Sequence, residues 1–172
     1  LQDAGFEVQV VANQVNEDYP DDLPLSAVPK YLAEKKARQY SSLRKGDVLL
    51  AADTIVKAGD RILDKPRDFE EGMDVIRQLS GRSHEVITGV CIHTHKLTKG
   101  FDCTTRVYFR MIEEEEIRFY LNKFFPYDKA GGYGIQEWLG MVAIERIEGS
   151  YYNVVGLPIH QVYQTLARFF SD

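Results

Sequence analysis

The strongest constraint on the fold is a nearly apolar run, residues 48–56, that contains one charged side chain, Asp53. Successive side chains of a β-strand point to opposite faces, so the odd-numbered residues would share a face with Asp53. The even-numbered residues, which are apolar except for Thr54, would line the other face. Apolar residues on both faces are typical of a strand that is covered on both sides. The run therefore predicts a central strand that carries one carboxylate.

A carboxylate in such a strand is costly unless it is paired, hydrogen-bonded or bound to a metal. In one interpretation Asp53 is structural and accepts hydrogen bonds from backbone amides near the strand end. In the other it is a site carboxylate at the end of a central strand. We favour the second interpretation and take Asp53 as the first candidate site residue.

Length and composition favour one globular domain over residues 1–172, or two closely joined lobes. The net charge of −5 argues against a general nucleic-acid binder. No apolar run approaches the roughly 20 residues of a membrane span, and no signal-peptide pattern is present. The two cysteines, Cys91 and Cys103, are interpreted as buried free thiols in a reducing compartment. We expect a cytoplasmic protein without nucleic-acid or membrane partners.

Periodicity predicts helices and strands that alternate without a clean βαβ repeat. The predicted strands cover residues 6–11, 48–56, 61–63, 85–94, 104–111 and 140–147, and the predicted helices cover 28–40, 69–80, 113–124 and 157–170. Asp68 is a plausible N-cap for the second helix, with Glu71 as its capping-box partner and Gly81 at the position that stops the helix. Strands 85–94 and 104–111 should form an antiparallel hairpin. The expected fold class is mixed α/β (α+β), with a mixed rather than a purely parallel sheet.

Three further charged residues are candidates for a site. Lys36 falls on the apolar stripe of the first helix, where a lysine either snorkels outward or meets an anion. Lys65 precedes a proline, which restricts its backbone to extended conformations, although an ordinary surface lysine would fit equally. Glu17 lies in a polar loop, where a solvated glutamate is the simplest interpretation.

A glycine-rich segment, residues 128–136, reads Asp-Lys-Ala-Gly-Gly-Tyr-Gly-Ile-Gln. Glycines so closely spaced permit positive φ angles and close approach of the backbone to a ligand. The order of residues matches neither the P-loop nor the dinucleotide-binding fingerprint. The segment is therefore either a tight turn or a ligand loop that ends in Gln136.

The candidates make better chemical sense together than singly. Asp53 and Glu17 could hold Mg²⁺ or Mn²⁺, Lys36 and Lys65 could hold phosphates, and Gln136 could contact a base. Metal and lysines would stabilise charge on a pyrophosphate leaving group while a carboxylate activates water. The hypothesis is a site for phosphoanhydride hydrolysis.

Six short motifs, in the same order along residues 1–170, resemble the Maf family, the septum-formation-inhibitor-like nucleotide pyrophosphatases. In one-letter code these motifs are LAxxKA (32–37), AADTIV (51–56), LxKP (63–66), LSGRxHxVxTGV (79–90), DKAGxYGIQ (128–136) and GSYxNVVGLP (149–158). The resemblance implies an α/β fold around an elongated central mixed sheet flanked by helices, with a cleft between two lobes, similar to that of the inosine-triphosphate pyrophosphatases. It also implies a possible homodimer.

The resemblance further implies hydrolysis of a nucleoside triphosphate to the monophosphate and pyrophosphate, with a divalent metal. Asp53 would accept the proton of the attacking water and lie near the metal, and Glu17 would match the metal-associated acidic position. Lys36 and Lys65 would contact the phosphates. Further along the chain, Thr54 and Gln136 match the dTTP/UTP-preferring branch, whereas the 7-methyl-GTP branch carries Gln and Glu there.

Two departures from the family pattern stand out. The family opens with a strand and a Ser-x-Ser-Pro-Arg-Arg-like loop that grips the phosphates. Leu1 stands just after the place where that segment should end, so either the segment lies outside this sequence or the site lacks its serine and arginines. Asp64 replaces the glycine that the family usually has before Lys-Pro.

Two other functions remain open at this stage. A non-catalytic nucleotide-binding regulator of septum formation would use the same cleft as a sensor, and Asp53→Ala would leave its binding intact. Hydrolysis of non-canonical purine nucleotides is the other alternative, and the Thr54/Gln136 pair counts against it.

Overall fold

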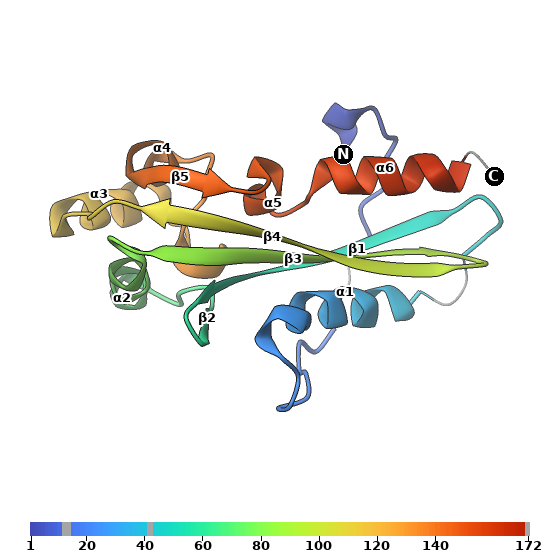
Figure 1. Ribbon diagram of the computed structural model, residues 1–172, viewed down its shortest axis with the longest axis horizontal. Coiled ribbons are helices and arrows are strands. Elements are labelled where there is room, and N and C mark those ends of the chain that lie inside the picture. The colour runs from blue at the N-terminus through green and yellow to red at the C-terminus, as the bar shows by residue number, and fades with distance from the viewer. Residues whose placement is uncertain (12–14, 41–42, 171–172) are drawn as a thin grey trace.

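The computed structural model describes residues 1–11, 15–40 and 43–170, and its core is one five-stranded sheet (Figure 1). The strands, in the order β2-β1-β3-β4-β5 across the sheet, are β1 (Val48–Ala58), β2 (Arg61–Leu63), β3 (Ser83–Thr94), β4 (Thr98–Phe109) and β5 (Ile144–Glu148). The α-helices of the described ranges are α1 (Val28–Arg38), α2 (Phe69–Leu79), α3 (Glu114–Phe124), α4 (Trp138–Ala143), α5 (Tyr151–Val155) and α6 (Ile159–Phe170). Three 3-10 helices, η1 (Gln2–Ala4), η2 (Leu25–Ala27) and η3 (Ala130–Gly132), complete the elements. None of these helices is long and apolar enough to cross a membrane.

Every strand pair in the described residues is antiparallel. Tight turns join β1 to β2 and β3 to β4, and a chain that reverses through a short turn can only pair antiparallel. The hairpin predicted from residues 85–94 and 104–111 is thus confirmed. The α/β class is also confirmed, and these pairings are more uniform than the mixed sheet that we expected.

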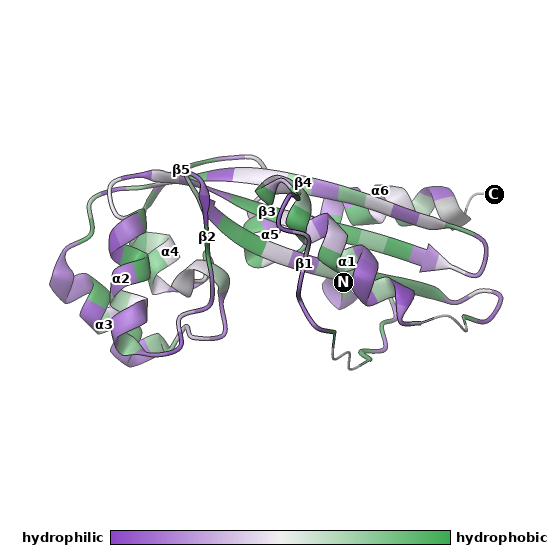
Figure 2. Ribbon diagram, turned by 90° about the horizontal axis from the view of Figure 1, so that it is seen from below, coloured by the Kyte–Doolittle hydropathy of each residue, from purple (hydrophilic) through white to green (hydrophobic). Residues whose placement is uncertain are grey.

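Helices divide the elongated sheet into two lobes. Helices α2, α3 and α4 gather at one end, whereas α1 and α6 cover opposite faces at the other end (Figures 1 and 2). The odd-numbered side of β1 packs on α1, where Leu49 and Ala51 join Ala33 and Ala37 in one cluster. The even-numbered side joins a cluster that includes α6 residues. Both faces of β1 are therefore covered, as its apolar pattern predicts.

The cap predicted for α2 is present with one difference. The Asp68 carboxylate accepts a hydrogen bond from the backbone N–H of Glu71 at 3.0 Å. The Glu71 carboxylate accepts the backbone N–H of Arg67 at 2.8 Å, one residue earlier than a capping box would place it. Gly81 adopts a φ of 67°, which confirms it as the residue that stops the helix.

One predicted strand is wrong, and the strand predicted over residues 140–147 is confirmed only from Ile144 onward. Residues 6–11 are not a strand: Phe6 packs against Tyr163 at 5.8 Å between ring centroids, but Val10 is 90% exposed. Alternation provides a face to bury, yet a strand also needs a partner for its backbone, and the described strands offer none here. Residues 138–143 form α4, so β5 begins only at Ile144. A short apolar run has no period that separates a buried strand from a buried helix.

Helix α1 lies unusually close to β3 at Gly89, the residue that pairs with Asp53 in the sheet register. A Cβ atom added at Gly89 would overlap backbone atoms of Pro29 and Lys30. Because backbone cannot move aside as a side chain can, this glycine sets the distance between helix and sheet.

We predict that Gly89→Ala lowers the free energy of unfolding by about 1–3 kcal/mol, because the added methyl group overpacks the contact with α1. Urea denaturation measures the change. Gly100→Ala is the matched control: it lies on the neighbouring strand, and its Cβ would meet only the Glu34 and Lys30 side chains. A Gly89→Ala protein as stable as the Gly100→Ala protein would contradict the predicted role of this contact.

Candidate active site

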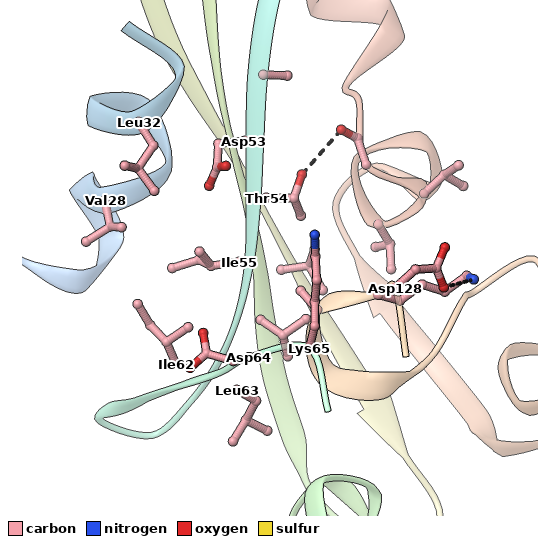
Figure 3. A pocket seen from close by; sticks show the side chains of 18 of the residues that line it. Val28, Leu32, Asp53, Thr54, Ile55, Ile62, Leu63, Asp64, Lys65 and Asp128 are labelled. Carbon is pink, nitrogen blue, oxygen red and sulfur yellow. Dashed lines mark hydrogen bonds and ion pairs between the residues drawn. The ribbon is translucent and has the colours of Figure 1, made fainter. Parts of the chain in front are cut away.

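A cavity of about 620 Å³ lies beside β1, within the size range of small-molecule sites. Strand β2 pairs only with the last three residues of β1, so in the described chain the rest of this edge has no second strand beside it. The cavity follows that open edge (Figure 3). The six residues proposed from the sequence all line it: Glu17, Lys36, Asp53, Thr54, Lys65 and Gln136.

Three of these residues form one charged cluster. The Lys36 ammonium lies 2.5 Å from Asp53 Oδ1 and 2.9 Å from Glu17 Oε1, so it bridges the two carboxylates. Lys36 can reach Asp53 because Ala33 and Ala37, its neighbours on α1, pack into the sheet. Of the two alternatives for Lys36, snorkelling outward or meeting an anion, the structure shows the second, with two carboxylates as the anions; contact with phosphates stays a prediction.

Burial and the Lys36 hydrogen bonds act against each other in this cluster, and burial prevails only at Asp53. Burial raises the pKa of the Asp53 carboxyl, and the hydrogen bond from Lys36 offsets only part of that increase. Burial also works against the charged form of Lys36, but hydrogen bonds to Asp53 and Glu17 outweigh it, so the pKa of this ammonium is raised. The Lys36 hydrogen bond lowers the pKa of the more exposed Glu17 carboxyl. Asp53 is thus a stronger base than an ordinary aspartate.

Asp53 and Thr54 point to opposite sides of β1 (Figure 3). Asp53 faces α1, while the Thr54 hydroxyl lies 2.9 Å from the Thr88 hydroxyl and 3.3 Å from the Gly156 carbonyl oxygen. Since the cavity runs around the open edge, it touches both sides. A ligand in the cavity could therefore contact the charged Asp53 side of β1 and the neutral Thr54 side at the same time.

Lys65 is the accessible cation of the cavity. It is exposed in the turn after β2, and in the described part of the chain it forms no ion pair. Its charge nevertheless reaches the charged cluster, because it acts on the Asp53 and Glu17 carboxyls after the larger effects of burial and Lys36. Lys65 is therefore available to an incoming anion.

The glycine-rich segment is a structured loop around the cavity rather than a simple turn. Gly131 and Gly132 have φ angles of 70° and 67°, which only glycine adopts easily. The backbone N–H of Gly134 donates to the Tyr120 hydroxyl at 3.1 Å, and that hydroxyl also bonds Glu137. Gln136, between the two anchored residues, is exposed and lines the cavity.

Sequence reasoning missed the side chains that fix this loop. Tyr120 is fully buried on α3, and the buried His84 ring lies 2.7 Å from the Tyr133 hydroxyl. Lys129 pairs with Glu137 at 3.1 Å and adds an ion pair across the loop. The available signal was a tyrosine on an apolar helix stripe, because a buried hydroxyl needs a partner.

The oxygen donors at this point suit a divalent cation that is held partly by substrate and water. They are too few to enclose a metal ion with protein ligands alone. No group of three or more His, Cys, Asp or Glu side chains converges anywhere in the described ranges. Asp53 and Glu17 supply two carboxylates at one point. Mg²⁺ is commonly held by one or two carboxylates together with substrate phosphates and water.

Comparison with known proteins gives consistent results. A family described as Maf-like protein matches residues 1–169. The dTTP/UTP pyrophosphatase of Porphyromonas gingivalis is 47% identical over 170 residues, which is 97% of this chain and 85% of the relative. Proteins of the same name from Parabacteroides distasonis and Christiangramia forsetii are 45% and 42% identical, covering 97% and 100% of this chain and 86% and 88% of the relatives.

His84 should make stability depend on pH. Burial lowers the pKa of His84 to about 4, whereas the unfolded chain binds the proton near its ordinary value. The stability that the neutral, buried His84 contributes is complete above its pKa in the unfolded chain. It is lost as pH falls toward its pKa in the folded protein. Between about pH 7 and about pH 5 the free energy of unfolding should fall by ~2 kcal/mol from this residue. Urea denaturation of His84→Gln, which cannot titrate, should show a pH dependence smaller by that amount; an unchanged dependence would contradict the assignment.

Proposed function

The chain belongs to the Maf-like family, and from that membership we propose that it hydrolyses dTTP and UTP to the nucleoside monophosphate and pyrophosphate. The observation that carries the proposal is the position of Asp53. A partly buried carboxylate with a raised pKa, paired with a lysine, lies on the edge of a cavity that also contains an accessible cation. The names of the relatives supply the class of substrate.

Asp53 acts as the general base in this proposal. Its carboxylate accepts a proton from the water that attacks the α-phosphorus, and its raised pKa improves it as an acceptor. Lys65, which lies at the open side of the cavity, stabilises the negative charge that develops on the departing pyrophosphate. The bond that breaks joins the α-phosphorus to the oxygen that bridges it to the β-phosphate.

Asp53 and Glu17 are the residues that would hold a divalent cation, Mg²⁺ or Mn²⁺. When bound, such a cation would neutralise charge on the phosphate oxygens. The two carboxylates come from a strand and a loop, so their convergence depends on the loop that precedes α1. Lys35 contributes to that position, because its ammonium donates to the Asp18 carbonyl oxygen at 2.8 Å.

The base would lie on the other side of the open edge of β1. Thr54 and Gln136 line this part of the cavity, and Val154 and Val155 add apolar surface for a ring. Gln136 carries both a donor and an acceptor, which suits the edge of a pyrimidine. The Thr54 hydroxyl is already engaged with Thr88 and Gly156, so it acts partly by fixing this wall.

We predict that Asp53→Asn lowers kcat by about 10²–10⁴-fold, since the amide cannot accept the proton of water. Pyrophosphate release is measured on a panel of nucleoside triphosphates with Mg²⁺ or Mn²⁺. Asp60→Asn, an exposed residue of the β1–β2 turn, is the control and should keep full activity. Tight nucleotide binding without turnover in the unmodified protein would instead favour the non-catalytic regulator.

A double substitution tests whether Thr54 and Gln136 recognise the base of the nucleotide. Thr54→Gln with Gln136→Glu introduces the pair of the 7-methyl-GTP branch and removes the hydroxyl that fixes Gly156. The ratio of kcat/KM for UTP to that for 7-methyl-GTP should fall by at least about 10-fold. An unchanged ratio, with activity retained, would show that these residues do not select the base.

A further inference from the structure

Lys36 occupies the place where the two carboxylates meet. Its nitrogen lies within hydrogen-bond distance of both Asp53 Oδ1 and Glu17 Oε1, and it is the cation that brings them together. The side chain of Asp53 is only 11% exposed, so its charge depends on a nearby partner rather than on water. The same two oxygens are the ones that the proposed function assigns to a divalent cation.

Charge balance argues against Lys36 serving the carboxylates and a triphosphate simultaneously. One ammonium already faces two carboxylates, which leaves the cluster with an excess negative charge. A phosphate brought to the same nitrogen would add a third anion to a partly buried site, where repulsion is strong. A divalent cation on the carboxylates would remove this conflict, provided that the ammonium gives up its place.

We propose that the Lys36 ammonium is a resident counter-cation, which leaves Asp53 and Glu17 when a divalent cation binds them and then pairs with the phosphates. This inference rests on the proposed function for the identity of its ligands. It makes Lys36 a positioning residue in the free protein and a phosphate ligand in the loaded one.

The surroundings of Lys36 allow this exchange. Its α1 backbone is fixed by buried neighbours, but the side chain lines the cavity and has four flexible carbons. Lys65 lines the same cavity and marks the accessible region in which phosphates would gather. A swing of one side chain, without movement of the helix, is therefore enough.

Two consequences follow for binding. The nucleotide-free protein should bind a divalent cation weakly, because the cation must displace the Lys36 ammonium. Bound nucleotide should increase the affinity for the cation, because its phosphates can pair with the displaced Lys36 ammonium. Couplings between ligands at adjoining sites are commonly about 5- to 150-fold in affinity.

Binding of Mn²⁺ alone, measured by titration calorimetry without nucleotide, tests the exchange. Lys36→Met should bind Mn²⁺ at least about 5-fold more tightly than the unmodified protein. Lys65→Met is the matched control: it removes the same charge from the same cavity but leaves both carboxylates bridged. Because the Lys65 charge acts on the two carboxylates only from a distance, Lys65→Met should gain clearly less affinity than Lys36→Met, and adding Asp53→Asn to Lys36→Met should abolish the gain.

Unchanged or weaker Mn²⁺ binding by Lys36→Met would overturn the proposal, as would an equal gain in Lys65→Met. Circular dichroism establishes that each variant is folded. A second readout uses the unmodified protein: Mg²⁺ should increase acetylation of Lys36 by acetic anhydride relative to Lys65, because displacement exposes the amine. A decrease, or no change, would also overturn it. Neither measurement involves turnover, so failure of the pyrophosphatase assay would be a separate result.

Discussion

The close packing of α1 against β1 and β3 is the constraint on which the site depends. Ala33 and Ala37 present small side chains to the sheet, and Gly89 has no side chain that would overlap the backbone of α1. This proximity puts Lys36 beside Asp53 and allows a carboxylate to remain in a strand that is otherwise apolar. A larger residue at any of these contacts would move the helix, and the ion pair would move with it.

The open edge of β1 turns this buried pair into an accessible one. Because β2 is short, the cavity reaches Asp53 from the α1 side and Thr54 from the other. A nucleotide placed across the edge would present its phosphates to charged groups and its base to neutral ones. The far lobe contributes the loop that carries Gln136, anchored through Tyr120. In the proposed function, chemistry and base selection would thus belong to different elements, separated by the width of one strand.

Much of this arrangement could be predicted from residue patterns. The apolar run around Asp53 predicts a central strand, and the stripe position of Lys36 marks it as a lysine that either snorkels outward or meets an anion, because both signals are local and periodic. The pairing of Lys36 with Glu17 could not be predicted, since no spacing links a loop to a helix face. The wrong strand at 6–11 fails for a related reason: alternation does not say whether a partner strand is present. Residue roles, a single domain, a homodimer and a cytoplasmic location remain predictions.

The proposed function depends most on attack of water on the α-phosphorus, the step that Asp53 would promote. Hydrolysis of UTP in isotopically labelled water, followed by mass spectrometry of the products, locates the attacked atom. We expect the heavy oxygen to enter UMP and pyrophosphate to stay unlabelled. Label in pyrophosphate would show attack on the β-phosphorus, and formation of UDP with orthophosphate would show cleavage of a different bond; either result would rule out the proposed reaction.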